Sequence, residues 1–381
     1  MRTKSERFLN SPRILIVFSD VNASSQLIAI LERLRSYKAN FKVLLIGDQT
    51  LQVAQDMSKA SIEFKLLTPK DKYSAFTLFW AVWIEIIRNR PKVIYASGQF
   101  ASAVGISCGF LAGIKLRAFT RHHSDFHHKY EMKFGVFVDK LTNMLANRII
   151  AVSRVVQEIL VNHENVPQKK VSLIPNGIDL LKFTSVRSQR GGHRLPSRQG
   201  SQSFNVGIVS RMTNWKGIEY AAKAFIQFQR QYPNTHLTII GAFSDSYEKI
   251  SDVLKVLPKE SYTLEKFRPN IPEFLSELDV LVHVPIGFRD EAFGIIYIEA
   301  LAAGIPCIVT VSGVLHELPD LKNYVEVVPY MDSHSILEGM LKVANDHAES
   351  KSFVPDLWLQ GYSLEKMADR YSKLLLGKEI T

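Results

Sequence analysis

The chain has 381 residues, of which 46% are hydrophobic and 22% charged, and a formal net charge of +10. This length exceeds what one hydrophobic core usually serves, so we expect a globular protein of two domains. The two cysteines, Cys108 and Cys307, lie far apart in the sequence, which excludes a disulfide framework and fits a reducing compartment.

The sequence also excludes several classes of protein. The apolar run near the N-terminus is too short for a signal peptide, and no stretch reaches the roughly 20 apolar residues of a membrane span. The basic residues are dispersed and carry no nucleic-acid-binding signature, so we expect no nucleic-acid partner. We predict a cytoplasmic protein whose charge favours a phosphorylated small molecule or the surface of an anionic membrane.

The first half of the chain alternates short apolar runs with helical patterns, as parallel α/β sheets do. Apolar residues recur at helical spacing between the runs, for example at residues 24–39. The predicted strands are residues 13–18, 41–47, 62–67, 92–96, 115–120, 148–153 and 170–175.

An aromatic segment at residues 74–87 holds Phe76, Phe79, Trp80 and Trp83. We expect these rings to pack against the sheet, because the segment is too short to cross a membrane. The alternative is a surface that binds a membrane.

The octet RHHSDFHH, at residues 121–128, holds four of the eleven histidines and follows the strand predicted at 115–120. His123 and His127 are four residues apart, which on a helix would place them on one face as a metal pair. Zinc needs further ligands and neither cysteine is near in the sequence, so we predict no metal. The remaining interpretations are a sugar- or phosphate-binding edge and a hydrated loop.

The composition changes at residues 184–203, which contain four arginines, no acid and almost no large apolar residue. This is typical of an exposed linker. The α/β pattern then restarts, and the chain closes with helical apolar spacing at residues 363–377. The strands predicted in this half are residues 204–211, 236–242, 279–285, 306–311 and 324–329.

We accordingly predict four parts of the chain. They are an N-terminal domain at residues 1–180, a basic linker at 181–203, a second domain at 204–360 and a C-terminal helix at 361–381. In such domains ligands bind at the carboxyl ends of the strands.

Common nucleotide motifs are missing from the sequence. No G-x-G-x-x-G follows the first strand, which disfavours a nicotinamide or flavin site, and no G-x-x-x-x-G-K-[ST] phosphate loop occurs. No D-x-D occurs either, so a divalent metal on a nucleotide diphosphate has no evident carboxylate ligands.

The stretch RDEAFGIIYIEALAAGIPCIV, at residues 289–309, carries the strongest signal. Seven residues separate Glu291 from Glu299; on one helix their carboxylates would lie about 12 Å apart along the axis. That is farther than the acid/base pair of a glycoside hydrolase. The helix N-terminus, with backbone N–H groups at Phe293, Gly294 and Ile295, would bind an anion such as phosphate. The alternative is an amphipathic helix with two solvated glutamates.

A second stretch, VSRMTNWKG at residues 209–217, follows the first strand of the second domain. Ser210, Arg211 and Lys216 stand where a parallel sheet presents its ligands. Arginine offers a fork to phosphate oxygens and lysine a point charge. The alternative is an ordinary loop with a lysine that covers apolar surface. In LIPNGID, at residues 173–179, the turn indicates a crossing between the domains.

Together, SRMTNWKG, DEAFGIIYIEALAAGIPCIV and IPNGID resemble the glycosyltransferase family 4 pattern, the glycogen-synthase-like group 1 of the GT-B superfold. The resemblance spans nearly the whole chain, and Ala292 replaces its usual glycine. It implies an α/β fold of two Rossmann-like domains whose parallel sheets face each other across a cleft. It also implies a C-terminal helix that crosses back to the first domain.

The resemblance implies a retaining, metal-independent transfer of a hexose or N-acetylhexosamine from a nucleotide-diphosphate sugar. Arg211 and Lys216, beside Ser210, would hold the diphosphate. Glu299 would bind the ribose hydroxyls and Glu291 the donor sugar. The backbone N–H groups of Phe293, Gly294 and Ile295 would contact the sugar or the phosphate.

In the histidine octet, the resemblance implies His122 first, and His123 second, as a hydrogen-bond partner of the donor sugar. Imidazole can donate or accept near neutral pH. His127 and His128 would then be neighbouring groups, and Asp125 would orient a histidine or cap the next helix.

The partners implied are a UDP-, GDP- or ADP-sugar and a glycan or lipid-linked acceptor, at a step of cell-surface polysaccharide or lipopolysaccharide synthesis. No cofactor is expected beyond the donor, and contact with the inner face of a membrane is compatible with the charge. The alternatives are a sugar-nucleotide epimerase or hydrolase on the same fold, and a non-catalytic protein that binds nucleotide sugars or glycans.

Overall fold

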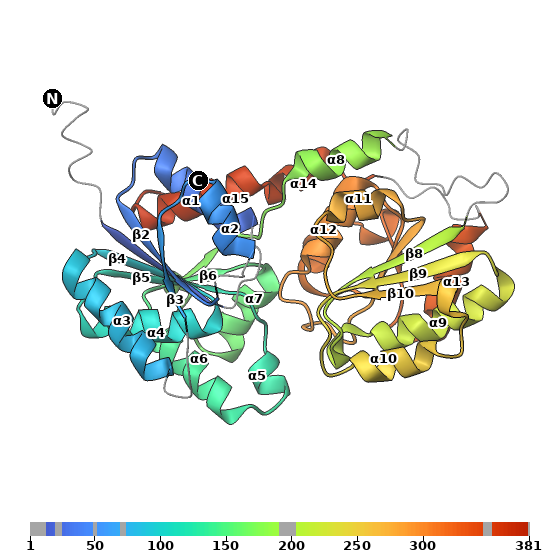
Figure 1. Ribbon diagram of the computed structural model, residues 1–381, viewed down its shortest axis with the longest axis horizontal. Helices are drawn as coiled ribbons and strands as arrows, with labels where there is room; N and C mark the ends of the chain where they lie inside the picture. Colours follow the sequence, from blue (N-terminus) through green and yellow to red (C-terminus); the bar gives the residue numbers. More distant parts are fainter. Residues whose placement is uncertain are drawn as a thin grey trace. The chain divides into compact units, whose positions relative to one another are not determined.

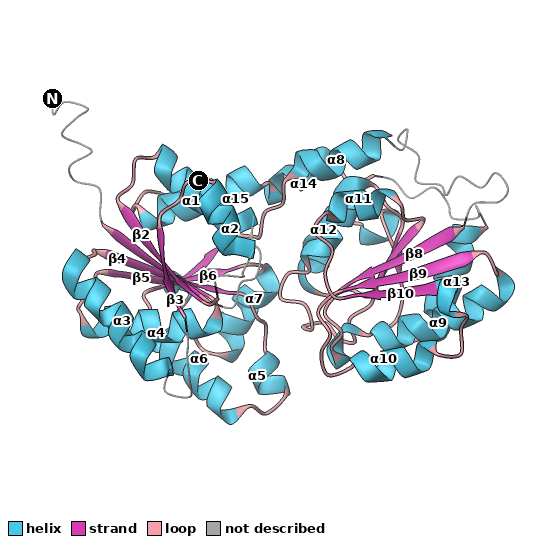
Figure 2. Cartoon of the chain, in the orientation of Figure 1, coloured by secondary structure: helices cyan, strands magenta, loops and turns pink. Residues whose placement is uncertain are grey.

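The computed structural model describes residues 13–19, 25–48, 52–68, 74–189, 203–345 and 353–379. The chain forms two compact units, one of residues Met1–Gly177 with Ser363–Thr381 and one of residues Ile178–Tyr362. Each unit is a twisted parallel sheet with helices on both sides (Figures 1 and 2).

The first unit is built on a seven-stranded sheet in the order β3-β2-β1-β4-β5-β6-β7. Its neighbouring strands are all parallel. Because both faces are covered, central strands such as β1 are buried at every residue. All seven strands predicted in this half are present: β1 (Ile14–Phe18), β2 (Phe41–Ile46), β3 (Phe64–Leu67), β4 (Val93–Ser97), β5 (Leu116–Arg121), β6 (Arg148–Ala151) and β7 (Val171–Leu173).

Helices cover the two faces of this sheet in separate groups (Figure 1). One group buries a core of aliphatic residues that includes Ile16, Leu31 and Val43, and the other buries one that includes Val17, Val82 and Cys108. The first group is α1 (Ser25–Ser36), α2 (Gln52–Lys59) and α15 (Leu364–Leu375), and the second is α3 (Ser74–Asn89) and α4 (Gln99–Leu111). Helix α6 (Lys133–Leu145) packs against α4. Shorter helical segments follow at α5 (Phe126–Lys129), α7 (Arg154–Glu158), η1 (Ile159–His163) and η2 (Gln168–Lys170).

The C-terminal helix α15 packs on α1, so the prediction that it returns to the first domain is confirmed. Its apolar side buries Met367, Tyr371 and Leu374 in the sheet core. Arg33 of α1 pairs with Asp369 of α15 at 2.6 Å on the outer side.

The aromatic segment only partly follows its prediction. Phe79 and Trp83 pack inward and stack on each other, with ring centroids 6.4 Å apart. Phe76 and Trp80 point outward instead, so their prediction as core residues is wrong. The helix is apolar on more than one face, and the sheet can bury only one of them.

The second unit has a six-stranded sheet in the order β10-β9-β8-β11-β12-β13, again all parallel. Five of its strands were predicted, and β10 was not. The strands are β8 (Phe204–Val209), β9 (Thr235–Ile240), β10 (Tyr262–Glu265), β11 (Val280–His283), β12 (Cys307–Val309) and β13 (Glu326–Val327).

Helices on both faces complete this unit, and on one face a cluster of aliphatic and aromatic side chains fills the space between the helices and the sheet. The longer ones are α8 (Leu180–Gln189), α9 (Ile218–Gln231), α10 (Tyr247–Leu254), α12 (Ile295–Ala303) and α13 (Ser333–Ala344). The shorter ones are α11 (Ile271–Ser276), α14 (Asp356–Leu359), η3 (Asn214–Lys216), η4 (Lys259–Ser261), η5 (Gly313–Glu317), η6 (Leu321–Asn323) and η7 (Gln360–Tyr362).

The segment predicted as a linker begins with a helix. Helix α8 packs on α11 and α12 and buries Phe183 and Val186, which lie three residues apart on one side of it. Burial of these two side chains against α11 and α12 stabilises the helix. Residues 190–202 of the predicted linker lie outside the described part of the chain.

In each sheet the strand order reverses direction once, between β1 and β4 and between β8 and β11. Ligands of open α/β sheets bind at such reversals, at the carboxyl ends of the strands. Among the described residues, no helix has the length and apolar character needed to span a membrane.

Candidate active site

In the second unit, a buried carboxylate lies where the strand order reverses. Glu291 is 8% exposed, and its Oε1 accepts hydrogen bonds from Lys216 Nζ at 2.5 Å and from His283 Nε2 at 2.7 Å. Lys216 belongs to the turn after β8, and His283 is the last residue of β11. The two neighbouring strands therefore deliver both partners to the same carboxylate oxygen.

The neighbouring charges determine the protonation state of Glu291. Burial alone would raise the pKa of this carboxyl group, but the Lys216 ammonium and the His283 ring outweigh it and lower the pKa to about 2. Glu291 is therefore ionised at neutral pH and is held in one orientation by two donors.

The turn that carries Lys216 depends on Gly217. This residue has φ +68° and begins α9, and a Cβ atom at its position would lie 1.9 Å from the carbonyl oxygen of Val284. Only glycine fits a left-handed conformation against backbone at this distance. The close approach of the turn to the end of β11 brings Lys216 to Glu291.

Glu291 lies in a loop and not on a helix, which corrects the expected geometry. Helix α12 begins at Ile295, after Gly294 with φ +78°, so the separation of about 12 Å expected for one continuous helix does not apply. The loop is held from the other side, because Ser312 Oγ accepts from the Glu291 backbone N–H at 3.0 Å and donates to the Gly287 carbonyl. The solvated-glutamate alternative is wrong for Glu291.

Glu299 lies on α12 itself and is partly buried. Burial raises the pKa of its carboxyl group to about 7. The two glutamates of the motif thus differ in character, since one is an ion-paired carboxylate and the other an acid that titrates near neutrality. The Phe293 side chain is buried. Ile295 is the first residue of α12 and Gly294 its N-cap, so the N–H groups of residues 293–295 lie at and just before the helix N-terminus, which attracts anions.

Ser210 and Arg211 follow β8 at the same edge of the sheet. The Ser210 backbone N–H donates to the carbonyl of Ile240 at 2.8 Å, which continues the pairing of β8 with β9. The Arg211 side chain is exposed. A cation on the surface and a second one at the buried carboxylate therefore share this edge, an arrangement suited to an anionic ligand.

In the first unit, the histidine octet begins inside β5 and leaves its carboxyl end. His122 is exposed, and its Nε2 lies 2.9 Å from the Ser97 hydroxyl at the end of β4. Strands β4 and β5 are neighbours in the sheet, so their carboxyl ends lie side by side. His128 is exposed as well, whereas His127 is buried.

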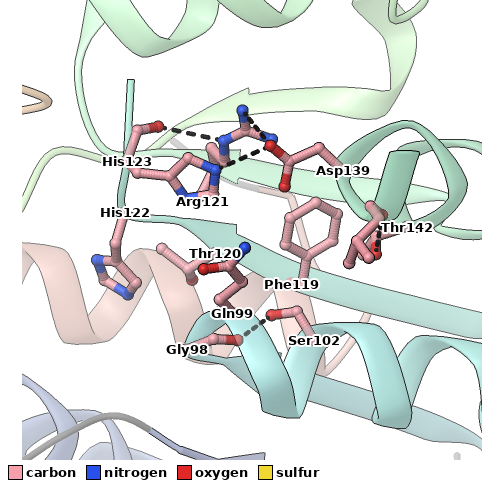
Figure 3. Close-up of a pocket in the computed structure, with 11 residues that line it drawn as sticks. Gly98, Gln99, Ser102, Phe119, Thr120, Arg121, His122, His123, Asp139 and Thr142 are labelled. Carbon is pink, nitrogen blue, oxygen red and sulfur yellow. Dashed lines mark hydrogen bonds and ion pairs between the residues drawn. The ribbon is translucent and has the colours of Figure 1, made fainter. Parts of the chain in front are cut away.

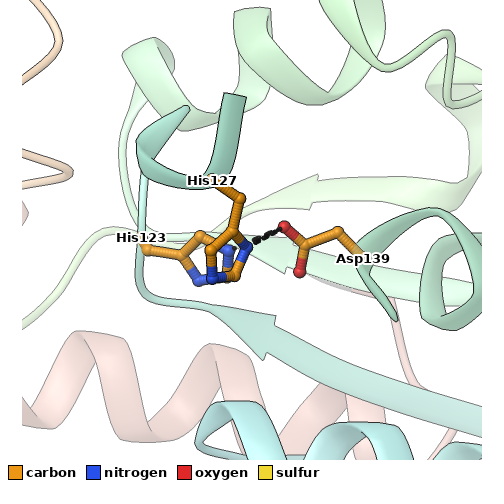
Figure 4. A group of neighbouring side chains, drawn as sticks. All are labelled: His123, His127 and Asp139. Atoms are coloured by element: carbon orange, nitrogen blue, oxygen red, sulfur yellow. Dashed lines mark hydrogen bonds and ion pairs between the residues drawn. The ribbon is translucent and has the colours of Figure 1, made fainter. Parts of the chain in front are cut away.

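Asp139 of α6 contacts two histidines of the octet, His123 and His127 (Figure 4). Its Oδ2 lies 2.6 Å from His127 Nδ1 and 3.1 Å from His123 Nε2, and the two rings touch with centroids 4.8 Å apart. Burial raises the pKa of Asp139, but hydrogen bonding to His123 and the charge of Arg121 outweigh this and lower it to about 2. The interpretation of the octet as a hydrated loop is therefore wrong.

His123 and His127 do meet, but not on one helix, because α5 begins only at Phe126. With Asp139 they form a group of three ligand atoms within 4.8 Å of one another. The Asp139 carboxylate already faces a buried cation, since Arg121 Nη2 lies 3.2 Å from Oδ2 and also pairs with Glu164 at 2.6 Å. The guanidinium therefore already balances the charge of the Asp139 carboxylate.

A small pocket opens beside this network (Figure 3). It is lined by Gly98 and Gln99 at the start of α4, by His122 and His123, and by Asp139. Asp125 occupies the N-cap position of α5, but its side chain makes no capping hydrogen bond.

Three side chains of these two networks, His283, Asp139 and Glu164, were not singled out from the sequence. His283 lies within the strand predicted at residues 279–285, and Asp139 and Glu164 lie outside the motifs that were recognised. The position of His283 at the carboxyl end of a strand was a signal that could have been used. The partners of Asp139 and Glu164 come from distant parts of the sequence, so no local signal existed.

Two family models match the chain. One, described as Glycosyltransferase Family 4, matches residues 29–181, and the other, described as Glycosyl transferases group 1, matches residues 196–355. The chain belongs to the group 1, family 4 glycosyltransferases. The resemblance seen in the sequence is confirmed.

Curated relatives of this glycosyltransferase are distant. An uncharacterized glycosyltransferase of Methanocaldococcus jannaschii is 29% identical over 52% of this chain and 51% of its own length. The UDP-Gal:alpha-D-GlcNAc-diphosphoundecaprenol alpha-1,3-galactosyltransferase of Escherichia coli is 24% identical over 76% of each chain. The match thus spans about half of the first relative and about three quarters of the second.

Solved structures confirm the GT-B-like fold. Anabaena HepE, crystallised with UDP and glucose, has a TM-score of 0.76 at 18% identity over 96% of this chain and 100% of its own. The UDP-GlcNAc 2-epimerase of Neisseria meningitidis has a TM-score of 0.63 at 16% identity over 96% and 100%. The fold is therefore shared by transferases and epimerases and does not separate them.

Proposed function

We propose that this glycosyltransferase moves a hexose or N-acetylhexosamine from a nucleotide-diphosphate sugar to a glycan or lipid-linked acceptor, with retention of the anomeric configuration and without a divalent metal. The observation that carries the proposal is the buried Glu291 carboxylate held by Lys216 and His283 at the reversal of the second sheet. A UDP-sugar is the first donor to test, since HepE binds UDP and the Escherichia coli relative is named for UDP-Gal.

In this proposal, Arg211 and Lys216 bind the diphosphate. The negative charge of the leaving nucleotide grows as the glycosidic bond breaks, and these two cations together with the N-terminus of α12 would stabilise it. The sequence contains no D-x-D, so the proposal assigns to these cations the role that a metal has in other transferases.

The carboxylates have different roles in the proposal. Glu291, ionised and fixed, accepts a hydrogen bond from a hydroxyl of the donor sugar and stabilises positive charge at its ring. Glu299 accepts hydrogen bonds from the ribose. The backbone N–H groups of Phe293, Gly294 and Ile295 bind the sugar or a phosphate oxygen.

From the first unit, His122 is the proposed partner of the donor sugar and His123 the second choice. The Ser97 hydroxyl orients the His122 ring, and Asp139 orients that of His123. We place the reaction in the cytoplasm, at a step of cell-surface polysaccharide or lipopolysaccharide synthesis, because the Escherichia coli relative is named for a diphosphoundecaprenol-linked acceptor.

The experiment is to incubate the protein with UDP-, GDP- and ADP-sugars and acceptor extracts and to follow nucleotide release with and without EDTA. We expect release from one class of donor, stimulated by acceptor and insensitive to EDTA. Binding without turnover would support a non-catalytic binding protein, conversion of the donor without transfer would support an epimerase or hydrolase, and loss of activity in EDTA would refute the metal-free mechanism.

A further inference from the structure

Helix α3 exposes an apolar stripe to solvent. Phe76, Trp80, Ile84 and Ile87 follow one another at steps of four, four and three residues, which places them on one side of the helix. Phe76 is 66% exposed and Ile87 57%, and the Phe76 ring packs edge-on against Trp80. The stripe lies opposite the residues that α3 buries, so the core does not explain it.

Helix α6 repeats the pattern. Phe134, Phe137 and Met144 are exposed on it, and the partly exposed Leu141 completes the same spacing of three and four residues. Phe134 is 79% exposed, more than the other large apolar side chains of this unit. Asp139 lies on the opposite, buried side of the helix, toward the histidines.

The two stripes belong to one surface. Helix α4 packs against both α3 and α6, and the three helices lie on the same side of the sheet (Figure 1). Where α4 ends, Phe110 and Leu111 are exposed too. We call the exposed apolar side chains of these three helices the outer face. Monomeric soluble proteins rarely expose an apolar surface that extends over several elements without a partner for it.

The charges around the outer face are almost all positive. On α6, Lys133 and Lys140 stand on either side of Phe134 and Phe137 in the sequence, and both lysines are exposed. The ends of the three helices and the strands that follow them add exposed bases at Arg88, Arg90, Lys92, Lys115 and Arg148. Between residues 76 and 148, all of which the structure describes, Glu131 is the exposed carboxylate.

An apolar face surrounded by bases distinguishes between two kinds of partner, a second copy of this chain and a lipid bilayer. A second copy docked on the same face would bring lysines against lysines, because a two-fold interface pairs a surface with itself. A bilayer with anionic lipids instead accepts aromatic and aliphatic side chains at the headgroup level and attracts the surrounding bases. We propose that the outer face of α3, α4 and α6 is a membrane-docking surface that binds anionic lipid bilayers.

The membrane-docking surface deepens the proposed function. The inference rests on that function only in assuming that the acceptor is linked to a lipid. Helix α6 presents Phe134 and Phe137 outward and Asp139 inward, to the pocket that His122 and His123 line. Docking would therefore hold that pocket about one helix diameter, roughly 10 Å, from the lipid surface. A lipid-linked acceptor could then reach the pocket without leaving the bilayer.

The test is co-sedimentation of the full chain with vesicles of phosphatidylcholine alone and of phosphatidylcholine mixed equally with phosphatidylglycerol. We expect binding to the mixed vesicles, weakened about tenfold or more in the double variant Phe134→Ser/Phe137→Ser. In Lys133→Gln/Lys140→Gln we expect a loss of about fivefold per lysine. Leu181→Ser and Leu357→Ser are matched controls, since both leucines are more than 80% exposed but belong to the second unit; they should bind as the wild type does.

A second readout covers the case in which a double variant folds poorly. Trp80 fluorescence should shift to shorter wavelength on addition of mixed vesicles, and Trp80→Phe should abolish most of that shift while it retains binding. The inference is overturned if the wild type does not bind mixed vesicles, or if the phenylalanine variants bind them as well as the wild type does. It is also overturned if the chain forms dimers through the outer face instead of binding vesicles. Nucleotide release from the donor in the absence of vesicles should be equal in all these variants, so that failure of docking and failure of the proposed function are distinguishable.

Discussion

The substitution Glu291→Gln tests the central contact of the second unit. It keeps the shape of the side chain and an oxygen acceptor but removes the charge that faces Lys216 and His283. The Lys216 side chain is 11% exposed and that of His283 3% exposed, so water cannot replace the lost charge well. A buried cation left without its counter-charge is costly.

The size of the effect follows from the pKa of Glu291. A shift from 4.5 to about 2 corresponds to about 3 kcal/mol in favour of the ionised form in the folded state. Because the folded pKa lies below the unfolded value, this stabilisation is present above about pH 4.5 and is lost as the pH falls toward 2. We therefore expect Glu291→Gln to lower the free energy of unfolding by about 3 kcal/mol at pH 7 and by much less near pH 3.

Urea unfolding at pH 7 and pH 3, followed by circular dichroism, measures this difference. The matched control is Glu277→Gln, since Glu277 is well exposed and lies 3.6 Å from Arg268; it should cost about 1 kcal/mol or less at either pH. The reasoning is wrong if Glu291→Gln is neutral at pH 7, or if its cost is the same at pH 3.

Three further substitutions test separate parts of the structure. Gly217→Ala should destabilise the protein by about 2 kcal/mol or more, through the clash with the Val284 carbonyl and the positive φ, whereas Gly361→Ala, with open space around it, should be neutral in thermal unfolding. Asp139→Asn should lower the free energy of unfolding by about 3 kcal/mol at pH 7 and by progressively less below pH 4, because the pKa of this carboxyl is lowered in the folded state. An equal loss at pH 7 and pH 3 in urea unfolding would count against the hydrogen-bond network around Asp139. Glu299→Gln should leave the free energy of unfolding unchanged at pH 4 and raise it above pH 7, since the raised folded pKa makes the ionised form unfavourable there. Calorimetric titration of this variant should also show weaker nucleotide binding, and unchanged binding would remove Glu299 from the donor site.

Much of the fold was readable from the sequence, because buried parallel strands are apolar along their whole length. Strand β10 was missed because its four residues, Tyr262–Glu265, lie at the edge of the sheet, are only partly buried and include one aliphatic side chain, that of Leu264. Helix α8 escaped because two apolar residues in a basic segment are a weak local signal, and only α11 and α12 give them a place to pack.

The site was readable in its residue types but less in its geometry. Glu291, Lys216 and Arg211 were all singled out from their motifs, yet the sequence placed Glu291 on a helix that begins four residues later. The pairing of Glu291 with His283 and that of Asp139 with the histidines could not be found, because contacts between strands and helices depend on tertiary packing and not on spacing. The aromatic residues of α3 failed for the same reason, since which face of an apolar helix meets the sheet is decided in three dimensions.

The most direct test of the proposed reaction is the configuration of its product. With a donor that turns over and EDTA present, proton NMR of the glycoside formed should show the same anomeric configuration as the donor sugar. A product of inverted configuration, or conversion of the donor with no glycoside formed, would contradict the account.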